Sequence, residues 1–271
     1  MPTDAFVLAL AAAVLHALWN VLLARTRDPQ AATAAAFCMA VAIFAPIAAA
    51  RWRMEAAAWK YVAASAAFEL AYVLLLSTAY VRAPLSVFFP IARGFAPVLV
   101  LVVAVAALGV STSWEQALGV CAVGAGILMV RGRKPDRAAT VFGLAIAITI
   151  AGYTLIDNTG VTHADPLAYL EAVMVGPALV TAAVVAFRQG TPALRAAFRW
   201  ETAAIAPLTL APYALALYAL RLAPAAPVAA VRETSVLFAT ILAAVMLKEH
   251  VSVWRAVGAA TVVGGVVLLV V

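Results

Sequence analysis

Charged residues are scarce in this chain. Lys, Arg, Asp and Glu make up 11% of its 271 residues, whereas soluble domains carry about 25%. Cysteine is also rare, with two residues, while 67% of the chain is hydrophobic. Disordered chains are poor in apolar residues, and small disulfide-bonded domains are rich in cysteine. The composition therefore excludes all three of these classes and favours a polytopic membrane protein.

Catalytic and nucleotide-binding motifs are missing as well. The sequence has no HExxH zinc motif, no Gly-x-Gly-Asp string and no Walker phosphate-binding loop, and no Ser/His pair lies in matched apolar stretches. An intramembrane enzyme is therefore disfavoured, and we expect no catalytic residue, bound metal or cofactor. Because no ATP site is recognisable, an ion gradient or exchange would have to drive any transport.

Long apolar stretches fill most of the sequence. A helix needs about 20 apolar residues to cross a bilayer, and solid apolar runs favour helices over the alternating strands of a barrel. Ten such stretches can be assigned, at 5–24, 31–50, 61–80, 85–108, 114–130, 138–161, 166–187, 202–220, 224–247 and 253–271. The sequence therefore predicts an all-α polytopic membrane protein with ten transmembrane helices and short loops.

Basic residues are distributed unevenly among the predicted loops. The odd-numbered loops carry twelve Lys and Arg residues and the even-numbered loops carry four. The positive-inside rule places the richer loops in the cytoplasm, which leaves both termini outside, although the second loop with three basic residues argues against this assignment. The rule also accounts for the net charge of +6, so no nucleic-acid partner is implied.

An internal repeat can be read from the positions of rare residues. Residues 84–130 align with 223–269 at a constant offset of 139, and Arg93 then falls on Arg232. This match is informative because charged residues inside spans are rare.

The first predicted helix aligns with the sixth at an offset of 137, so that His16 meets Tyr153 and Asn20 meets Asp157. We therefore predict two five-helix domains, at 1–131 and 138–271. Because five is odd, the second crosses the membrane in the opposite sense, as in many secondary transporters with a binding site between the repeats.

Ionisable residues inside the predicted spans are functional candidates, because burying them in a membrane is costly. They are His16, Glu69, Arg93, Asp157, Glu171, Arg232 and Glu233. The two arginines lie about eight residues into their helices, about 12 Å deep at 1.5 Å per residue. Such an arginine can hold a carboxylate or phosphate through two hydrogen bonds. The alternative is an internal ion pair with one of the three glutamates.

Glu69 lies at the centre of the third predicted helix and shares a face with Ser65 and Tyr72. A carboxyl group in apolar surroundings can take up and release a proton near neutral pH. Glu69, Glu171 and Glu233 are therefore candidates for proton coupling. The alternative is a permanent partnership with an arginine.

Polar and aromatic groups also mark two matched helix faces, which carry His16, Trp19 and Asn20 in the first helix and Tyr153 and Asp157 in the sixth. Together with Tyr72, Arg93 and Arg232 they are expected to line a substrate cavity. The alternative is hydrogen bonding between helices, worth about 0.6 kcal/mol per bond.

Four prolines are expected to break helices beside this cavity. Pro90 and Pro97 flank Arg93, and Pro207 and Pro212 lie in the eighth predicted helix. Each proline leaves the carbonyl four residues earlier without its helical donor. Such gaps are tolerated where the backbone lines a cavity or packs on protein, so a packing kink without a ligand is the alternative.

Three segments carry a recognisable pattern: His16-Ala-Leu-Trp-Asn20, Leu85-Ser-Val-Phe-Phe-Pro-Ile-Ala-Arg-Gly94, and Arg232-Glu-Thr-Ser-Val-Leu-Phe-Ala239 followed by Leu247-Lys-Glu249. They resemble the drug/metabolite transporter superfamily, specifically EamA-type ten-helix carriers, over nearly the whole chain. One departure is Gly109-Val110, where such carriers often have Gly-Glu.

The resemblance implies a central cavity lined by the first, third, fourth, sixth, eighth and ninth helices and open to one side at a time. It also implies cytoplasmic termini, opposite to the charge count. The fold does not select among the amino acids, nucleotide sugars, cations and other metabolites that such carriers move.

The expected function is a secondary active transporter that exports a small polar metabolite by alternating access across a bacterial-type cytoplasmic membrane. The arginines favour a substrate with a carboxylate or phosphate, and the embedded carboxylates favour a cation or proton coupling. The expected partners are the substrate, a proton or exchanged solute, and membrane lipid, with the chain as a monomer or homodimer. A lipid flippase and a non-transporting interaction subunit remain as alternatives.

Overall fold

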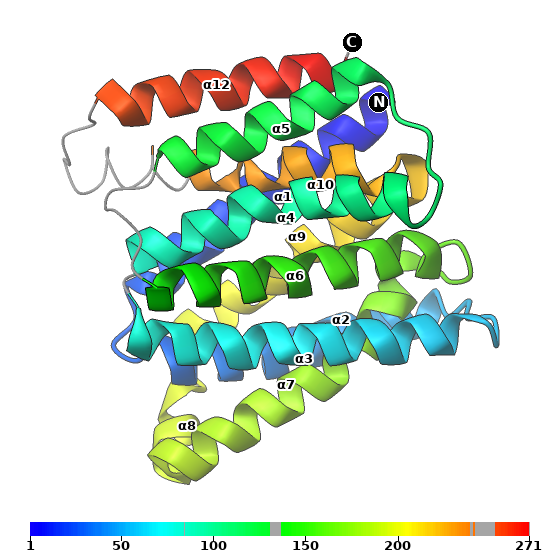
Figure 1. Ribbon diagram of the computed structural model, residues 1–271. Coiled ribbons are helices and arrows are strands. Elements are labelled where there is room, and N and C mark those ends of the chain that lie inside the picture. The colour runs from blue at the N-terminus through cyan, green and yellow to red at the C-terminus, as the bar shows by residue number, and fades with distance from the viewer. Residues whose placement is uncertain (84, 131–136, 239–240, 242–252, 271) are drawn as a thin grey trace.

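The computed structural model describes residues 1–83, 85–130, 137–238, 241 and 253–270. Eleven helices make up nearly all of this part, and they lie roughly side by side in Figure 1. They are α1 (Thr3–Ala24), α2 (Pro29–Ala50), α3 (Ala58–Arg82), α4 (Leu85–Ala106), α5 (Trp114–Met129), α6 (Arg137–Gly160), α7 (Pro166–Gln189), α8 (Thr191–Ala197), α9 (Trp200–Leu222), α10 (Ala225–Glu233) and α12 (Val253–Val270).

Seven of these helices are long and apolar enough to cross a membrane, namely α1, α2, α3, α4, α6, α7 and α9. Two further apolar helices, α5 and the 256–270 part of α12, are shorter. The all-helical, multi-pass architecture agrees with the sequence prediction. The count of ten spans stays a prediction, because the ninth predicted span runs into residues outside the described part.

An Asp-Pro pair lies at the start of both α2 and α7. Asp28 precedes Pro29, and its carboxylate accepts backbone hydrogen bonds from Gln30 and Ala31 at 3.1 Å. Asp165 precedes Pro166 and accepts from Leu167 N at 3.0 Å. An aspartate cap satisfies free N–H groups of the first turn, and proline at the first helical position needs no donor. The two Asp-Pro pairs therefore fix equivalent helix starts in the two halves of the chain.

Helix packing is reciprocal between the two halves. Helix α1 packs on α9 as α3 packs on α6, and α2 packs on α9 as α3 packs on α7. Three further pairs, α2 with α7, α4 with α10 and α5 with α12, join a helix to its own counterpart. Exchanging the halves therefore maps these pairs onto one another, as a pseudo-two-fold axis requires.

Glycines bring α5 and α12 into backbone contact, and the two helices lie side by side in Figure 1. A Cβ on Gly126 would come 2.6 Å from the Gly258 oxygen, and a Cβ on Gly119 would come 2.8 Å from the Gly265 oxygen. Small residues allow this close approach. Since Gly119 corresponds to Gly258 and Gly126 to Gly265, the seam between α5 and α12 has the same reciprocal pattern and lies within one chain.

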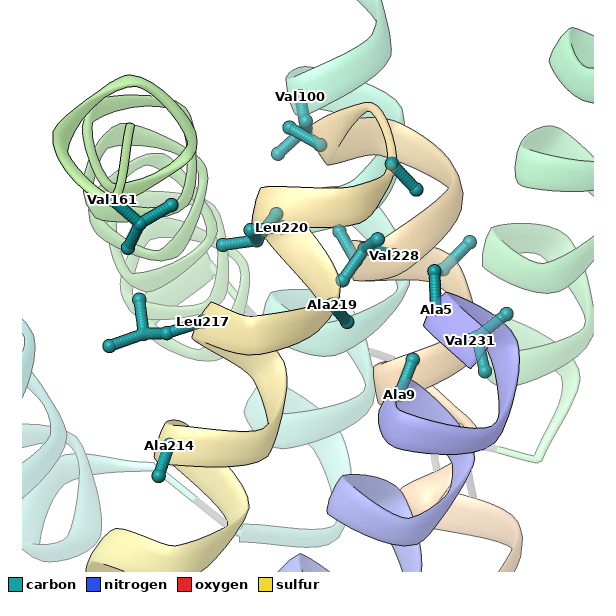
Figure 2. Close-up of a cluster of buried hydrophobic side chains, with 14 of the residues drawn as sticks. Ala5, Ala9, Val100, Val161, Ala214, Leu217, Ala219, Leu220, Val228 and Val231 are labelled. Carbon is teal, nitrogen blue, oxygen red and sulfur yellow. The ribbon is translucent and has the colours of Figure 1, made fainter. Parts of the chain in front are cut away.

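Small side chains fill the interior around α9 (Figure 2, yellow ribbon). Leu217 and Leu220 of α9 are buried, as are Ala5 and Ala9 of α1 and Val231 of α10. Alanine adds little bulk, so α1 and α10 can pack closely on α9. This packing brings the polar positions of the same helices within reach of one another.

One helix ends inside a predicted span, while two helices continue past the prolines that were expected to break them. Helices α4 and α9 continue through Pro90, Pro97, Pro207 and Pro212, so these prolines end neither helix, and a kink at them stays a prediction. The interruption lies instead at Thr234, within the predicted span 224–247. Here the Thr234 backbone N–H and hydroxyl both donate to Val231 O, at 3.1 and 2.6 Å. Helix α10 therefore ends at Glu233, and helical turns resume at 235–238. The sequence also gave no sign of the short helix α8.

Two loops from different halves meet at one end of the helices. Met54 and Ala164 form an antiparallel bridge, and Asp165 N donates to Arg53 O at 2.8 Å. The His163 Nδ1 atom lies 2.8 Å from a Glu55 carboxylate oxygen. At the opposite helix ends, Gln189 donates to Gln30 at 3.1 Å. The first of these joins includes backbone hydrogen bonds and a β-bridge. In the described residues the second consists of side-chain contacts, namely this amide contact and the packing of Leu194 and Ala197 on Ala31 and Ala34.

Candidate functional site

A buried ion pair joins the two halves of the molecule. Arg93 of α4 and Glu233 at the end of α10 have side chains that are 3% and 1% exposed. Arg93 Nη1 donates to both Glu233 carboxylate oxygens, at 3.2 and 3.1 Å. The internal ion pair considered for Arg93 therefore forms, and among the three candidate glutamates its partner is Glu233.

The second terminal nitrogen of Arg93 faces α1 and α3. Arg93 Nη2 lies 2.9 Å from His16 Nε2 and donates to the Tyr72 hydroxyl at 3.4 Å. Trp19 Nε1 also lies 3.2 Å from His16 Nδ1. A neutral imidazole accepts at one nitrogen only, so His16 accepts from either Arg93 or Trp19. The shorter contact to a charged donor favours Arg93.

Arg232 is less fully paired than Arg93. Its Nη2 donates to the Tyr153 hydroxyl at 2.7 Å, and its Nε lies 4.0 Å from Glu233. Glu233 therefore lies between the two guanidinium groups. Within the described part of the chain, Tyr153 is the one hydrogen-bond partner of the Arg232 guanidinium, which has five N–H donors. Arg232 therefore has the larger capacity for a further anionic group.

Asp157 of α6 is fully buried and holds two tyrosine hydroxyls. Tyr169 of α7 donates to Oδ1 at 3.0 Å and Tyr213 of α9 donates to Oδ2 at 2.6 Å. Neither tyrosine was among the residues expected in the site. The available signal was that a buried tyrosine needs a hydrogen-bond partner, and Asp157 is the buried carboxylate that both can reach.

Glu69 of α3 is 6% exposed and lies among the same groups. Its electrostatic neighbours include Asp157, Arg232 and Tyr213. Among the residues that the structure describes, no ion pair within 4.0 Å involves Glu69. Glu69 is thus buried beside two arginines and paired with neither.

Other predicted residues lie at the edge of this group or outside it. The Asn20 amide donates to His16 O of its own helix at 2.6 Å, and Trp19 packs edge-on against His16. Pro90 and Pro97 are buried in α4 on either side of Arg93. Glu171 of α7 is buried, and its Oε2 has no hydrogen-bond partner in the described residues. The structure therefore brings together most predicted cavity residues but leaves Glu171 apart.

We call the group formed by His16, Glu69, Tyr72, Arg93, Tyr153, Asp157, Tyr213, Arg232 and Glu233 the central polar cluster. Its members come from α1, α3 and α4 of the first half and from α6, α9 and α10 of the second. It has a cationic side around the two arginines and an acidic side around Glu69 and Asp157. Such a cluster can bind an anionic group at one side and a cation at the other.

Comparison with known proteins assigns the chain to a family. The EamA-like transporter family model matches residues 4–132 and again 137–271. A solved structure described only as "Crystal structure of protein" superimposes with a TM-score of 0.80 over 100% of this chain and 99% of that chain, at 15% sequence identity. At that identity the likeness shows a common fold. No curated protein sequence matches the chain.

The two family matches cover both halves of the sequence and agree with the resemblance seen in its three motif segments. Members of this family are membrane transporters of the drug/metabolite type and are not enzymes. This chain, a multi-pass integral membrane protein, belongs to the EamA-like transporter family.

Proposed function

We propose that this protein is a secondary active transporter that exports a small polar metabolite by alternating access across a bacterial-type cytoplasmic membrane. The observation that carries the proposal is the central polar cluster, in which six helices from both halves direct ionisable side chains to one buried place. A pure interaction subunit has no need of so many buried charges. A lipid flippase, the alternative, would need a lateral opening between helices.

We also propose that the two halves, 1–131 and 138–271, are inverted five-helix domains that move relative to each other. The reciprocal helix pairs and the reciprocal glycine seam support this division. The Met1 amine donates to Leu269 O at 2.8 Å, so both termini lie at one end of the molecule (Figure 1). An even number of membrane crossings would bring both ends of the chain to the same side of the membrane and would account for that position. The distribution of basic loops favours the outer side for both ends.

In this proposal the substrate binds between the halves. Arg232 holds its carboxylate or phosphate, and Glu233 is the counter-ion that both arginines share when no substrate is present. The cavity is lined by His16, Trp19, Asn20, Tyr72, Arg93, Tyr153 and Asp157. An ion gradient or exchange supplies the energy, and the protein acts as a monomer or homodimer.

Replacing Arg232 by glutamine is expected to reduce flux with the fold intact. A hydrogen bond to a charged group contributes about 1.5–3 kcal/mol, which corresponds to a fall in flux of about ten- to a hundredfold at low substrate concentration. A thermal-shift screen of amino acids, organic acids, sugar phosphates, nucleotide sugars, polyamines and quaternary amines selects the substrate. Flux of that substrate is then measured in proteoliposomes.

Arg199→Gln is the matched control, because Arg199 lies at the start of α9 with a side chain that is 59% exposed. It should transport like the wild type. Wild-type flux through the Arg232 variant would refute the role of this arginine. A flat response to every soluble compound would refute the small-metabolite proposal and favour a lipid substrate.

A further inference from the structure

Two hydroxyl groups beside the acidic side of the cluster lack partners. Ser65 Oγ and Thr154 Oγ1 are buried and have no hydrogen-bond partner in the described residues. Ser65 precedes Glu69 by four residues on α3, and Thr154 precedes Asp157 by three on α6, so each shares a helix face with a carboxylate. Unpartnered buried polar groups are rare in proteins and call for an explanation.

Ser65 is directed at the acidic groups of two neighbouring helices. Its hydroxyl lies close to the Asp157 carboxylate and to the Tyr169 hydroxyl, without the geometry of a hydrogen bond to either. Ser65, Glu69 and Asp157 therefore contribute only oxygen atoms to the acidic side, and Thr154 adds a buried hydroxyl one helical turn before Asp157 on α6. An all-oxygen set of carboxylates and hydroxyls suits a hard cation.

The summed charge of the cluster indicates the charge of an ion that would bind to it. Two guanidiniums, of Arg93 and Arg232, lie with three carboxylates, of Glu69, Asp157 and Glu233. With neutral His16 and every carboxylate ionised, the cluster is one positive charge short of neutrality. Uncompensated charge within a membrane is costly. One monovalent cation restores neutrality, whereas a divalent ion would reverse the imbalance.

We propose that Ser65, Glu69, Thr154 and Asp157 bind one monovalent cation, either a sodium ion or a proton, and that this cation couples the proposed transport to an ion gradient. Asp157 already accepts two tyrosine hydrogen bonds, so Glu69 is the carboxylate whose charge the cation neutralises. The groups that act on Glu69 come from α3, α4, α6, α9 and α10 and comprise Asp157, Tyr213, Arg232, Arg93, Tyr72 and Tyr153.

The α6 part of the site has no chemical counterpart on α1, the equivalent helix of the other half. At the offset that relates α1 to α6, Ala17 takes the place of Thr154 and Asn20 takes the place of Asp157. The symmetry-related position therefore lacks both a hydroxyl and a carboxylate.

Cation binding can be measured on the purified full-length protein without any metabolite. A ligand that binds the native state raises the midpoint of thermal unfolding. In the sodium arm, Na⁺ replaces N-methyl-D-glucamine at pH 8. In the proton arm, the pH falls from 8 to 6 without Na⁺. We expect a rise of about 5–10 °C in one arm once the cation is about a hundredfold above its Kd, and we expect Glu69→Gln to abolish it.

Two further variants test whether the cation-dependent rise of the unfolding midpoint arises at this site. Ser65→Ala removes one oxygen without changing charge, so it should raise the Na⁺ concentration needed by about tenfold or more in the sodium arm. Glu115→Gln, in the first turn of α5, is the control and should respond like the wild type.

A wild-type protein that responds in neither arm overturns the site, whether or not Glu69→Gln folds. A proton response retained by Glu69→Gln, or a sodium response unchanged by Ser65→Ala, overturns it as well. Metabolite flux without any cation response would leave the proposed transport function standing and refute this site alone.

Discussion

Replacing Glu233 by alanine is expected to lower the free energy of unfolding by about 3–5 kcal/mol, because removing one partner of a buried ion pair leaves the other charge uncompensated. Here two guanidiniums would be left, since Glu233 lies against Arg93 at 3.1 Å and within 4.0 Å of Arg232. The measurement is the midpoint of thermal unfolding of the purified variant in detergent.

Glu201→Ala is the matched control for this prediction. Glu201 lies 3.6 Å from Arg199, and their side chains are 44% and 59% exposed. Exposed ion pairs contribute about 0–1 kcal/mol, so this variant should unfold close to the wild-type midpoint. Equal midpoints for the Glu233 and Glu201 variants would mean that Glu233 does not hold the two arginines together.

Two adjacent glycines of α12 are expected to respond in opposite directions to the same substitution. A Cβ at Gly265 would come 2.8 Å from the Gly119 oxygen and 2.9 Å from the Val123 nitrogen, both backbone atoms of α5. Neither atom can move without shifting its helix, and overpacking costs about 1–3 kcal/mol. Gly265→Ala should therefore lower the unfolding midpoint by forcing α5 and α12 apart.

Gly264→Ala serves as the comparison, because no heavy atom lies within 4 Å of a Cβ at this position. Alanine is favoured over glycine in a helix by about 0.8–1 kcal/mol, so this variant should unfold at or slightly above the wild-type midpoint. The two variants are compared by thermal unfolding under the same conditions. A Gly265 variant as stable as the Gly264 variant would contradict the close approach of α5 and α12.

The sequence predicted the long helices well, because an apolar run and an Asp-Pro start are local features. Its internal alignment also made Arg93 and Arg232 equivalent positions of the two halves. The interruption at Thr234 could not be predicted, since it depends on backbone and hydroxyl hydrogen bonds back to Val231 that no sequence pattern marks. The prolines end neither α4 nor α9, and a kink at these positions stays a prediction.

The sequence alone could not predict which residues form ion pairs. Three glutamates were equivalent candidates for Arg93, and only the packing of α4 against α10 selects Glu233. The Tyr169 and Tyr213 contacts to Asp157 are of the same kind, since three separate helices must meet to form them. Sequence patterns place side chains on helix faces, whereas pairing depends on which faces meet.

The unequal loop joins at the two ends of the bundle have a practical consequence for labelling. An antibody epitope, fluorescent reporter or rigid fusion inserted at 53–55 or 163–165 would separate the strand-like contact between the halves. The short α8 segment at the opposite end is exposed along much of its length. Its described contacts to α2 are the packing of Leu194 and Ala197 on Ala31 and Ala34, with one amide contact next to its start and no backbone bridge. Insertions for imaging or for following domain movement therefore belong beside α8.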